Sequence, residues 1–137
     1  MTQEDKDLLF KDLCARLPYG VKIQVNDKIE TVEGINILDN IVEFGTYMAC
    51  DIDEVKPYLF PMSSMTEEQK KELRQMDAFI NTFGNICFAV YDEYGHDIVP
   101  TYEDSIRITN WLNKNMFDWR GLIPKGLAND ATGKNIY

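Results

Sequence analysis

The chain has 137 residues, the length of one domain of ordinary size. Its composition, 45% hydrophobic and 12% aromatic, is sufficient for a hydrophobic core and excludes wholesale disorder. The balance of 23 acidic against 14 basic residues gives a net charge of −9, which argues against non-specific binding to the phosphate backbone of nucleic acids. We therefore expect one folded domain over residues 1–137, and a nucleic-acid partner is disfavoured.

Targeting signals and the standard catalytic fingerprints are missing from the sequence. The start, MTQEDKDLLFKD, lacks the basic and apolar regions of a signal peptide, and no uncharged apolar run approaches the roughly 18–20 residues of a membrane span. The three cysteines form no CxxC pair, which favours reduced, mostly buried thiols. We expect a cytoplasmic protein with no membrane partner, no cofactor and no assigned catalytic residue. The cysteines are Cys14, Cys50 and Cys87.

The first predicted element is a helix over residues 3–17. Thr2 is a helix-capping residue, and Asp5 places an acid in the first turn. Pro18 ends the helix because proline disfavours helical geometry at the residue before it. An apolar stripe at helical spacing is formed by Leu9, Phe10, Leu13, Cys14 and Leu17.

The pattern then changes to that of β-strands. Apolar and polar residues alternate over 21–25, and turn pairs at 26–27 and 39–40 separate further apolar runs. Gly34 interrupts the second run where the alternation slips, which indicates a β-bulge. Two further strands are expected at 41–44 and 47–50. This pattern predicts a small antiparallel β-meander or a partly closed SH3-like barrel.

A link and a second helix follow the meander. Residues 57–61 are expected to form an irregular apolar link because a proline stands at each end. Thr66 and Gln69 form a capping box, which begins a helix predicted over 67–83, and Gly84 stands where that helix stops.

The last part of the chain predicts a strand and a third helix. The dense apolar run at 86–91 indicates a buried strand, with 98–99 as its return partner. Thr101 and Asp104 begin a helix, and the tail at 129–137 is expected to fray. The apolar face of this helix would hold Ile108, Trp111, Leu112 and Met116. Together the elements predict an α+β domain with about three flanking helices.

Charge is distributed unevenly along the chain. Residues 21–61 hold eight acids against three bases, residues 85–105 hold five acids and no base, and residues 106–137 hold five bases against two acids. The account we favour is that the basic C-terminal segment packs near the acidic ones and forms ion pairs. The alternative is an acidic face for a basic partner or for mimicry of nucleic acid.

The densest chemical cluster is the turn at 92–97, DEYGHD, which holds the only histidine of the chain. Carboxylates and an imidazole are ligands of divalent metals, so the candidate metal ligands are Asp92, Glu93, His96 and Asp97. Turns attract Asp and Gly for backbone reasons as well, and a solvated turn is the interpretation we favour. The acids at 51–54 lack the spacing of an EF-hand loop and are expected to cap a helical turn.

The segment 111–128, WLNKNMFDWRGLIPKGLA, combines aromatic, basic and glycine residues. A binding surface there would comprise Trp111, Phe117, Trp119, Arg120 and Lys125. The interpretation we favour is that the aromatics close the core and that Arg120 pairs with a carboxylate such as Asp118. Gly121 and Gly126 would then shape the turns.

Three segments resemble a known family, namely LCARLPYGVKI at 13–23, DEVKPYLFPMSSMTEEQKKE at 53–72 and WLNKNMFDWRGLIPKGLA at 111–128. Their order and spacing are similar to those of an uncharacterised family of small acidic proteins from gut Bacteroides-type bacteria, often found near phage or mobile-element genes. The resemblance covers about a third of the chain and implies no activity, cofactor or catalytic residue. Residues 84–100 depart from the family, so the 92–97 turn would not be a feature of all its members.

These observations lead to three functional hypotheses. The one we favour is a non-enzymatic interaction or accessory protein of phage or mobile-element origin that binds a protein partner, with a homo-oligomer as an open alternative. The second is a metal-dependent or carboxylate-based hydrolase that uses the 92–97 turn. The third is a nucleic-acid-binding module built on the small barrel and the basic 106–137 segment.

Overall fold

The computed structural model describes residues 1–81, 85–88, 94 and 102–137. Within these residues the three α-helices are α1 (Gln3–Arg16), α2 (Glu67–Gln75) and α3 (Tyr102–Lys114). The larger sheet contains β1 (Lys22–Val25), β2 (Lys28–Asn36), β3 (Ile41–Phe44), β4 (Met48–Asp51), β5 (Val55–Leu59) and β8 (Asn129–Asp130), and the smaller one contains β6 (Ala78–Ile80) and β7 (Ile86–Phe88). The predicted α+β class is confirmed. Short 3₁₀ turns lie at Leu17–Tyr19, Ile52–Glu54 and Met62–Ser64.

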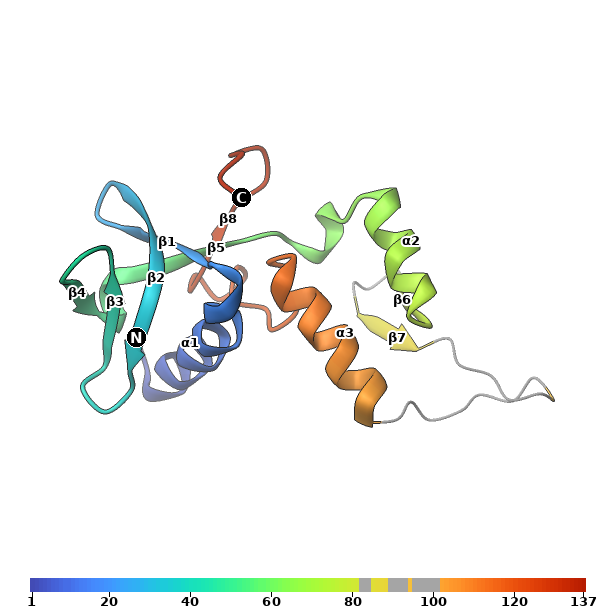
Figure 1. Ribbon diagram of the computed structural model, residues 1–137, viewed down its shortest axis with the longest axis horizontal. Helices are drawn as coiled ribbons and strands as arrows, with labels where there is room; N and C mark the ends of the chain where they lie inside the picture. The colour runs from blue at the N-terminus through green and yellow to red at the C-terminus, as the bar shows by residue number, and fades with distance from the viewer. Residues whose placement is uncertain (82–84, 89–93, 95–101) are drawn as a thin grey trace.

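The larger sheet is an open antiparallel meander extended by two later strands. Its strand order is β4-β3-β2-β1-β5-β8, in which β8 is parallel to β5 and every other pair is antiparallel. Figure 1 shows α1 packed beside this sheet, with α2, α3 and the smaller sheet on the other side of the molecule. The meander is the observed alternative. The partly closed SH3-like barrel is not formed, because β4 and β8 stand at opposite ends of the strand order.

The predicted bulge in β2 is confirmed. The pairing register between β2 and β3 shifts between Val32 and Gly34. Val32 and Ile35 both pack against the core although they are three residues apart, whereas a regular strand would place them on opposite faces. The extra residue therefore leaves Glu33 and Gly34 on the face turned away from the core.

Residues 55–59 form a strand where the sequence predicted an irregular link over 57–61. β5 pairs with β1, and Pro57 lies opposite Ile23. The parallel partner β8 contacts only Tyr58 and Leu59, so Pro57 occupies an edge position where a missing N–H donor is tolerated. The strand is favoured because Val55, Pro57, Tyr58 and Leu59 are all buried.

The second helix is shorter than the predicted 67–83. Its capping box at Thr66 is present, but α2 ends at Gln75, and Asp77 takes a left-handed conformation with φ +59°. The chain then forms β6, which pairs with β7. The predicted strand at 86–91 is confirmed over 86–88, while residues 89–91 and the expected return strand at 98–99 lie outside the described residues.

The first and third helices follow the prediction except at two side chains. Asp12 and Arg16 are buried on α1, whereas Cys14, expected in the apolar stripe, is exposed. Met116 lies beyond the end of α3 with φ +59°, and it is buried against the sheet rather than carried on the helix face. Asp12 and Arg16 are buried because they contact the segment after α3, through Arg120 and the Phe117 carbonyl.

The buried apolar residues form two clusters. One lies between the sheet and α1 and includes Leu9, Leu13 and Val42, and the other lies between α2, α3 and β6 and includes Leu73 and Ile108. Phe60 packs against both clusters, directly after β5.

The tail at 129–137 makes contacts that its polar sequence did not lead us to expect. β8 pairs with β5, and the Ala131 N–H donates to Leu59 O at 2.8 Å. The Tyr137 hydroxyl donates to Tyr58 O at 2.7 Å and accepts from the Lys22 N–H at 2.9 Å. Hydrogen bonds to backbone groups of the sheet hold the tail in place, and such bonds leave no apolar pattern in a sequence.

Candidate protein-interaction site

The acids of residues 21–61 lie mostly on the surface and have few cationic neighbours. All of them except Glu30 are exposed. Within the described residues one of them forms an ion pair, Asp53 with Lys6 at 3.6 Å. The expected pairing with the basic C-terminal segment is not found there. Arg107 pairs with Asp104 of the acidic segment 85–105, as expected, and Arg120 pairs with Asp12, so the acids of 21–61 keep their negative field.

Two of these acids line one pocket. A pocket of about 400 Å³ is formed by Glu33, Glu43, Gly45, Tyr47, Met48 and Ala49, which we call the acidic pocket. Its glutamates come from neighbouring strands, β2 and β3. No lysine or arginine is among the residues that line it.

The bulge in β2 brings the two glutamates together. Gly34, Glu43 and Ala49 stand opposite one another across β2, β3 and β4. A Cβ on Gly34 would lie 2.5 Å from Glu43 Oε2, so the Glu43 carboxylate lies directly over the glycine backbone. Because the bulge leaves Glu33 on the same face, two carboxylates border one hollow of the sheet surface. A cation entering there would relieve their mutual repulsion.

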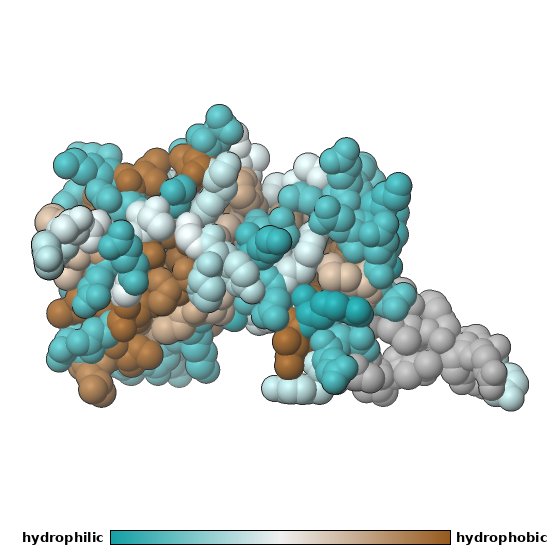
Figure 2. Space-filling model, in the orientation of Figure 1, coloured by the Kyte–Doolittle hydropathy of each residue, from teal (hydrophilic) through white to brown (hydrophobic). Residues whose placement is uncertain are grey.

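Large apolar side chains are exposed on the same strands. Figure 2 shows apolar residues interspersed with hydrophilic ones over the part of the molecule that holds the larger sheet. Tyr47 is fully exposed at the β3–β4 turn, and Met48 is 57% exposed at the start of β4. Ile29 on β2 is also exposed, as are Ile37 and Leu38 in the turn between β2 and β3. Exposed apolar residues beside charged ones are typical of protein-binding surfaces.

The aromatic residues of segment 111–128 are mainly part of the interior. Phe117 is buried, and Trp111 is half-buried and stacks on it with ring centroids 5.7 Å apart. Trp119 is 36% exposed, and its indole N–H donates to Asn113 Oδ1 at 3.0 Å. Lys125 is exposed. Phe117 therefore belongs to the core and not to an exposed patch, whereas Trp119 and Lys125 are exposed.

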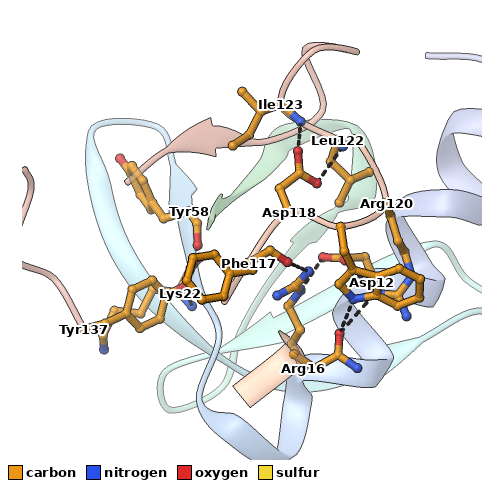
Figure 3. Close-up of polar contacts among 12 residues, drawn as sticks. Asp12, Arg16, Lys22, Tyr58, Phe117, Asp118, Arg120, Leu122, Ile123 and Tyr137 are labelled. Carbon is orange, nitrogen blue, oxygen red and sulfur yellow. Dashed lines mark hydrogen bonds and ion pairs between the residues drawn. The ribbon is translucent and has the colours of Figure 1, made fainter. Parts of the chain in front are cut away.

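Arg120 belongs to a buried polar network, shown in Figure 3. Its Nη1 donates to Asp12 Oδ1 at 2.8 Å, and the other Asp12 oxygen accepts from Arg16 Nε at 2.9 Å. Arg16 Nη2 donates to Phe117 O at 2.7 Å. The predicted Arg120–Asp118 pair is replaced by Arg120–Asp12, because the Asp118 carboxylate accepts hydrogen bonds from two backbone N–H groups.

This network fastens α1 to the segment that follows α3. The side chains of Asp12 and Arg16 are fully buried, and each is held by partners far along the chain. The Asp118 carboxylate receives the N–H groups of Leu122 and Ile123 at 2.7 and 2.8 Å, which shapes the turn at 118–123. Arg120 also lies 4.0 Å from the centroid of the Trp119 ring. These contacts position the backbone of 117–123. Gly121 and Gly126, which were predicted to shape the turns, adopt left-handed conformations with φ +77° and +74°.

Cys50, on the core side of β4, is protected as a thiol. Burial raises its pKa to about 11, and the nearby carboxylates of Glu54 and Asp51 add to the shift. A thiol with such a pKa carries little thiolate at neutral pH and is a weak nucleophile. Partial desolvation also raises the pKa of Cys14, whose residue is exposed overall.

The predicted metal ligands Asp92, Glu93, His96 and Asp97 lie outside the described residues. Among the residues that the structure does describe, no group of three or more His, Cys, Asp or Glu side chains is arranged to hold a metal ion. The acids at 51–54 cap a 3₁₀ turn as predicted, with the Asp51 carboxylate accepting from the Asp53 N–H at 2.9 Å. In the same described ranges, none of the helices has the length and apolarity needed to cross a membrane.

Sequence reasoning did not identify the residues of the acidic pocket as a site. Two signals were present, namely the excess of acids over 21–61 and the slip in alternation at Gly34. Neither indicates that Glu33 and Glu43 become neighbours, because that depends on the register of β2 and β3. Comparison of the chain with protein-family models, with curated proteins and with solved structures gives no match.

Proposed function

We propose that the protein is a non-enzymatic interaction protein whose acidic β2–β4 face binds a basic protein partner. The observation that carries this proposal is the acidic pocket, where Glu33 and Glu43 share one hollow without a lysine or arginine in its lining. The bulge places these two like charges on one face with no cation in the pocket lining, and a cationic group of a partner would supply the compensation.

The surroundings of the pocket favour a protein as the partner. Tyr47 and Met48 present exposed apolar surface within the pocket lining. Aromatic side chains and methionine are enriched in the centres of protein interfaces, and an aromatic ring attracts the cationic groups of lysine and arginine. The net charge of −9 would add long-range attraction for a basic partner.

The test compares capture of partners by the tagged wild-type protein and by two charge-matched double variants. Glu33→Gln with Glu43→Gln removes both carboxylates of the pocket. Glu4→Gln with Glu68→Gln removes two exposed carboxylates from α1 and α2, so its net charge is the same. We expect a basic protein from an extract of the native host to be retained by the wild type and by the control, and to be lost by the pocket variant.

Mass spectrometry identifies the captured protein, and titration with the purified partner at rising salt concentration gives the affinity. Binding through the pocket should weaken as salt rises. Equal retention by all three proteins, or a captured partner that is acidic, would contradict the proposal.

A further inference from the structure

The outer edge of β4 is open to a further strand. β4 ends the larger sheet and pairs with β3 on one side, and the part of the chain that the structure describes places no strand on its other side. Edge strands present unpaired backbone groups to which an extended segment of another chain can add. Met48, Ala49 and Asp51 are exposed along this edge.

The direction of the backbone groups of β4 follows from one hydrogen bond. The Asp51 N–H donates to Glu54 Oε2 at 3.3 Å, so it points away from β3. Backbone groups two residues apart in a strand point the same way, so the N–H of Ala49 also faces outward. An added strand would therefore find the Ala49 N–H and the carbonyls of Ala49 and Asp51 as partners.

The register across the sheet indicates the side chains that an added strand should carry. Ala49 stands opposite Glu43, and Asp51 lies two residues further along the same face of β4. A residue added opposite Ala49 would project from that face, one strand away from the Glu43 carboxylate. Every second residue of the added strand would face these acids, so lysine or arginine at alternate positions complements the edge.

A second copy of this chain fits the edge less well. Two β4 edges paired about Ala49 would bring the acidic pockets of both copies together, because Ala49 lines the pocket. Like charges close to each other across paired strands are destabilising. A basic segment would experience the opposite effect.

We infer that an extended basic segment of a partner protein adds as a strand to the outer edge of β4 and places alternate lysine or arginine side chains over Glu43 and Asp51. This inference rests on the function proposed above and specifies how the partner is bound. The backbone bonds supply the alignment, and the charges select the segment.

The test uses a short synthetic peptide, blocked at both ends, in which lysine alternates with threonine. A second peptide of the same sequence carries N-methyl groups on alternate backbone nitrogens, which preserves the charge but removes the donors needed for strand pairing. We expect the first peptide to bind and to protect the Ala49 amide from hydrogen exchange. We expect the methylated peptide to bind at least about ten-fold more weakly, because it loses several backbone hydrogen bonds.

A pair of variants tests the same edge from the side of the protein. Ala49→Pro removes the outward-facing N–H, at a position where an edge strand tolerates proline, and leaves every acid in place. Ala49→Ser retains that N–H and serves as the control. We expect Ala49→Pro to lose at least about ten-fold in affinity for the lysine–threonine peptide, Ala49→Ser to bind like the wild type, and both to keep the circular dichroism spectrum of the wild type.

The outcomes separate this inference from the proposed function. Equal affinity for the two peptides, or an unchanged affinity of Ala49→Pro, overturns strand addition while leaving charge-driven binding at the acidic face intact. In that case the Glu33→Gln, Glu43→Gln variant loses binding, whereas Ala49→Pro does not. No binding of the lysine–threonine peptide, or self-association of the chain that Ala49→Pro abolishes, overturns the basic segment as the occupant of the edge.

Discussion

Asp12 and Arg120 are separated by 108 positions in the chain, and Arg120 Nη1 donates a 2.8 Å hydrogen bond to the Asp12 carboxylate. The Asp12 side chain is fully buried and that of Arg120 is 15% exposed, so the contact is largely shielded from water. The second Asp12 oxygen holds Arg16, whose Nη1 is buried without a hydrogen-bond partner. Two guanidinium groups thus share one buried anion, which makes Asp12 the residue on which the network depends.

Replacing Asp12 by asparagine is expected to lower the free energy of unfolding by about 3–5 kcal/mol, because two cations lose their buried counter-charge. Asp7→Asn, on the exposed side of the same helix, is the matched control and should change it by no more than about 0.5 kcal/mol. Urea unfolding followed by circular dichroism gives both values. A midpoint for Asp12→Asn equal to that of the wild type would show that the network contributes nothing to stability.

Tyr47 is fully exposed and has φ +62°, a left-handed conformation that is unfavourable for an aromatic residue. We expect Tyr47→Gly to raise the free energy of unfolding by up to about 1 kcal/mol, because glycine adopts this conformation without strain. Thr46→Gly, one residue earlier in the turn and outside the left-handed region, should lower it. Thermal unfolding of the two variants would count against this account of the turn if both shifted Tm in the same direction.

Gly34 is the position where a side chain would disturb the acidic pocket. A Cβ there would lie 2.5 Å from Glu43 Oε2, the mobile end of a flexible side chain that can turn away. We expect Gly34→Ala to change the free energy of unfolding by less than about 1 kcal/mol and to weaken binding of the lysine–threonine peptide. Unfolding titrations and peptide anisotropy measure the two effects. A large loss of stability would mean that the backbone itself, and not the Glu43 carboxylate, requires glycine here.

Tyr137 is expected to make stability depend on alkaline pH. Burial raises the pKa of its hydroxyl from 10.0 to about 12, so the folded chain retains the phenolic proton at a pH where the unfolded chain releases it. This contribution is fully present below about pH 10 and is lost as the pH rises through about 12. Tyr137→Phe removes it.

The difference in stability between the wild type and Tyr137→Phe should therefore shrink from about pH 9 to about pH 12. Guanidinium chloride unfolding at several pH values measures that difference. Titration of the other tyrosines and of the lysines affects both proteins equally and therefore cancels in the difference. A difference that stays constant over this range would mean that the Tyr137 hydroxyl ionises as it does in an unfolded chain.

Cys50 should resist alkylation. With its pKa raised to about 11, it carries little thiolate near neutral pH, and it is half-buried as well. We expect iodoacetamide to modify it roughly a hundred-fold more slowly than glutathione at about pH 8, as followed by mass spectrometry of the digested protein. Alkylation at the glutathione rate would indicate an accessible, activated thiol.

Local patterns predicted much of the fold. The stripe at Leu9 and Leu13, the alternation over 21–25 and the slip at Gly34 each depend on neighbours a few residues away, and each is found in the structure. The prediction of a helix over 67–83 was wrong at its C-terminal end, where pairing with a later strand decides the structure. Beyond Gln75 the chain forms β6 with β7, although apolar residues continue at helical spacing. Secondary structure of that kind is set by the partner strand more than by propensity.

The candidate site shows the same division more sharply. The excess of acids over 21–61 can be read from the sequence, and so can the basic residues that could neutralise it. Tertiary structure decided that Arg120 reaches Asp12 and not these strands, and that Glu33 and Glu43 line one pocket. No local pattern distinguishes those arrangements, because each depends on which segments pack together.

By itself, then, the sequence determined an α+β chain with a capped first helix, a bulged antiparallel meander and a strongly negative charge. Hydrophobic period, capping residues and charge are local properties, so they can be followed along one chain. The open edge of β4, the acidic pocket beside it and the buried Asp12 network were decided only by the tertiary structure. Strand order, register and long-range ion pairs arise from contacts between segments far apart in the chain, where burial and pairing of whole elements outweigh local preference.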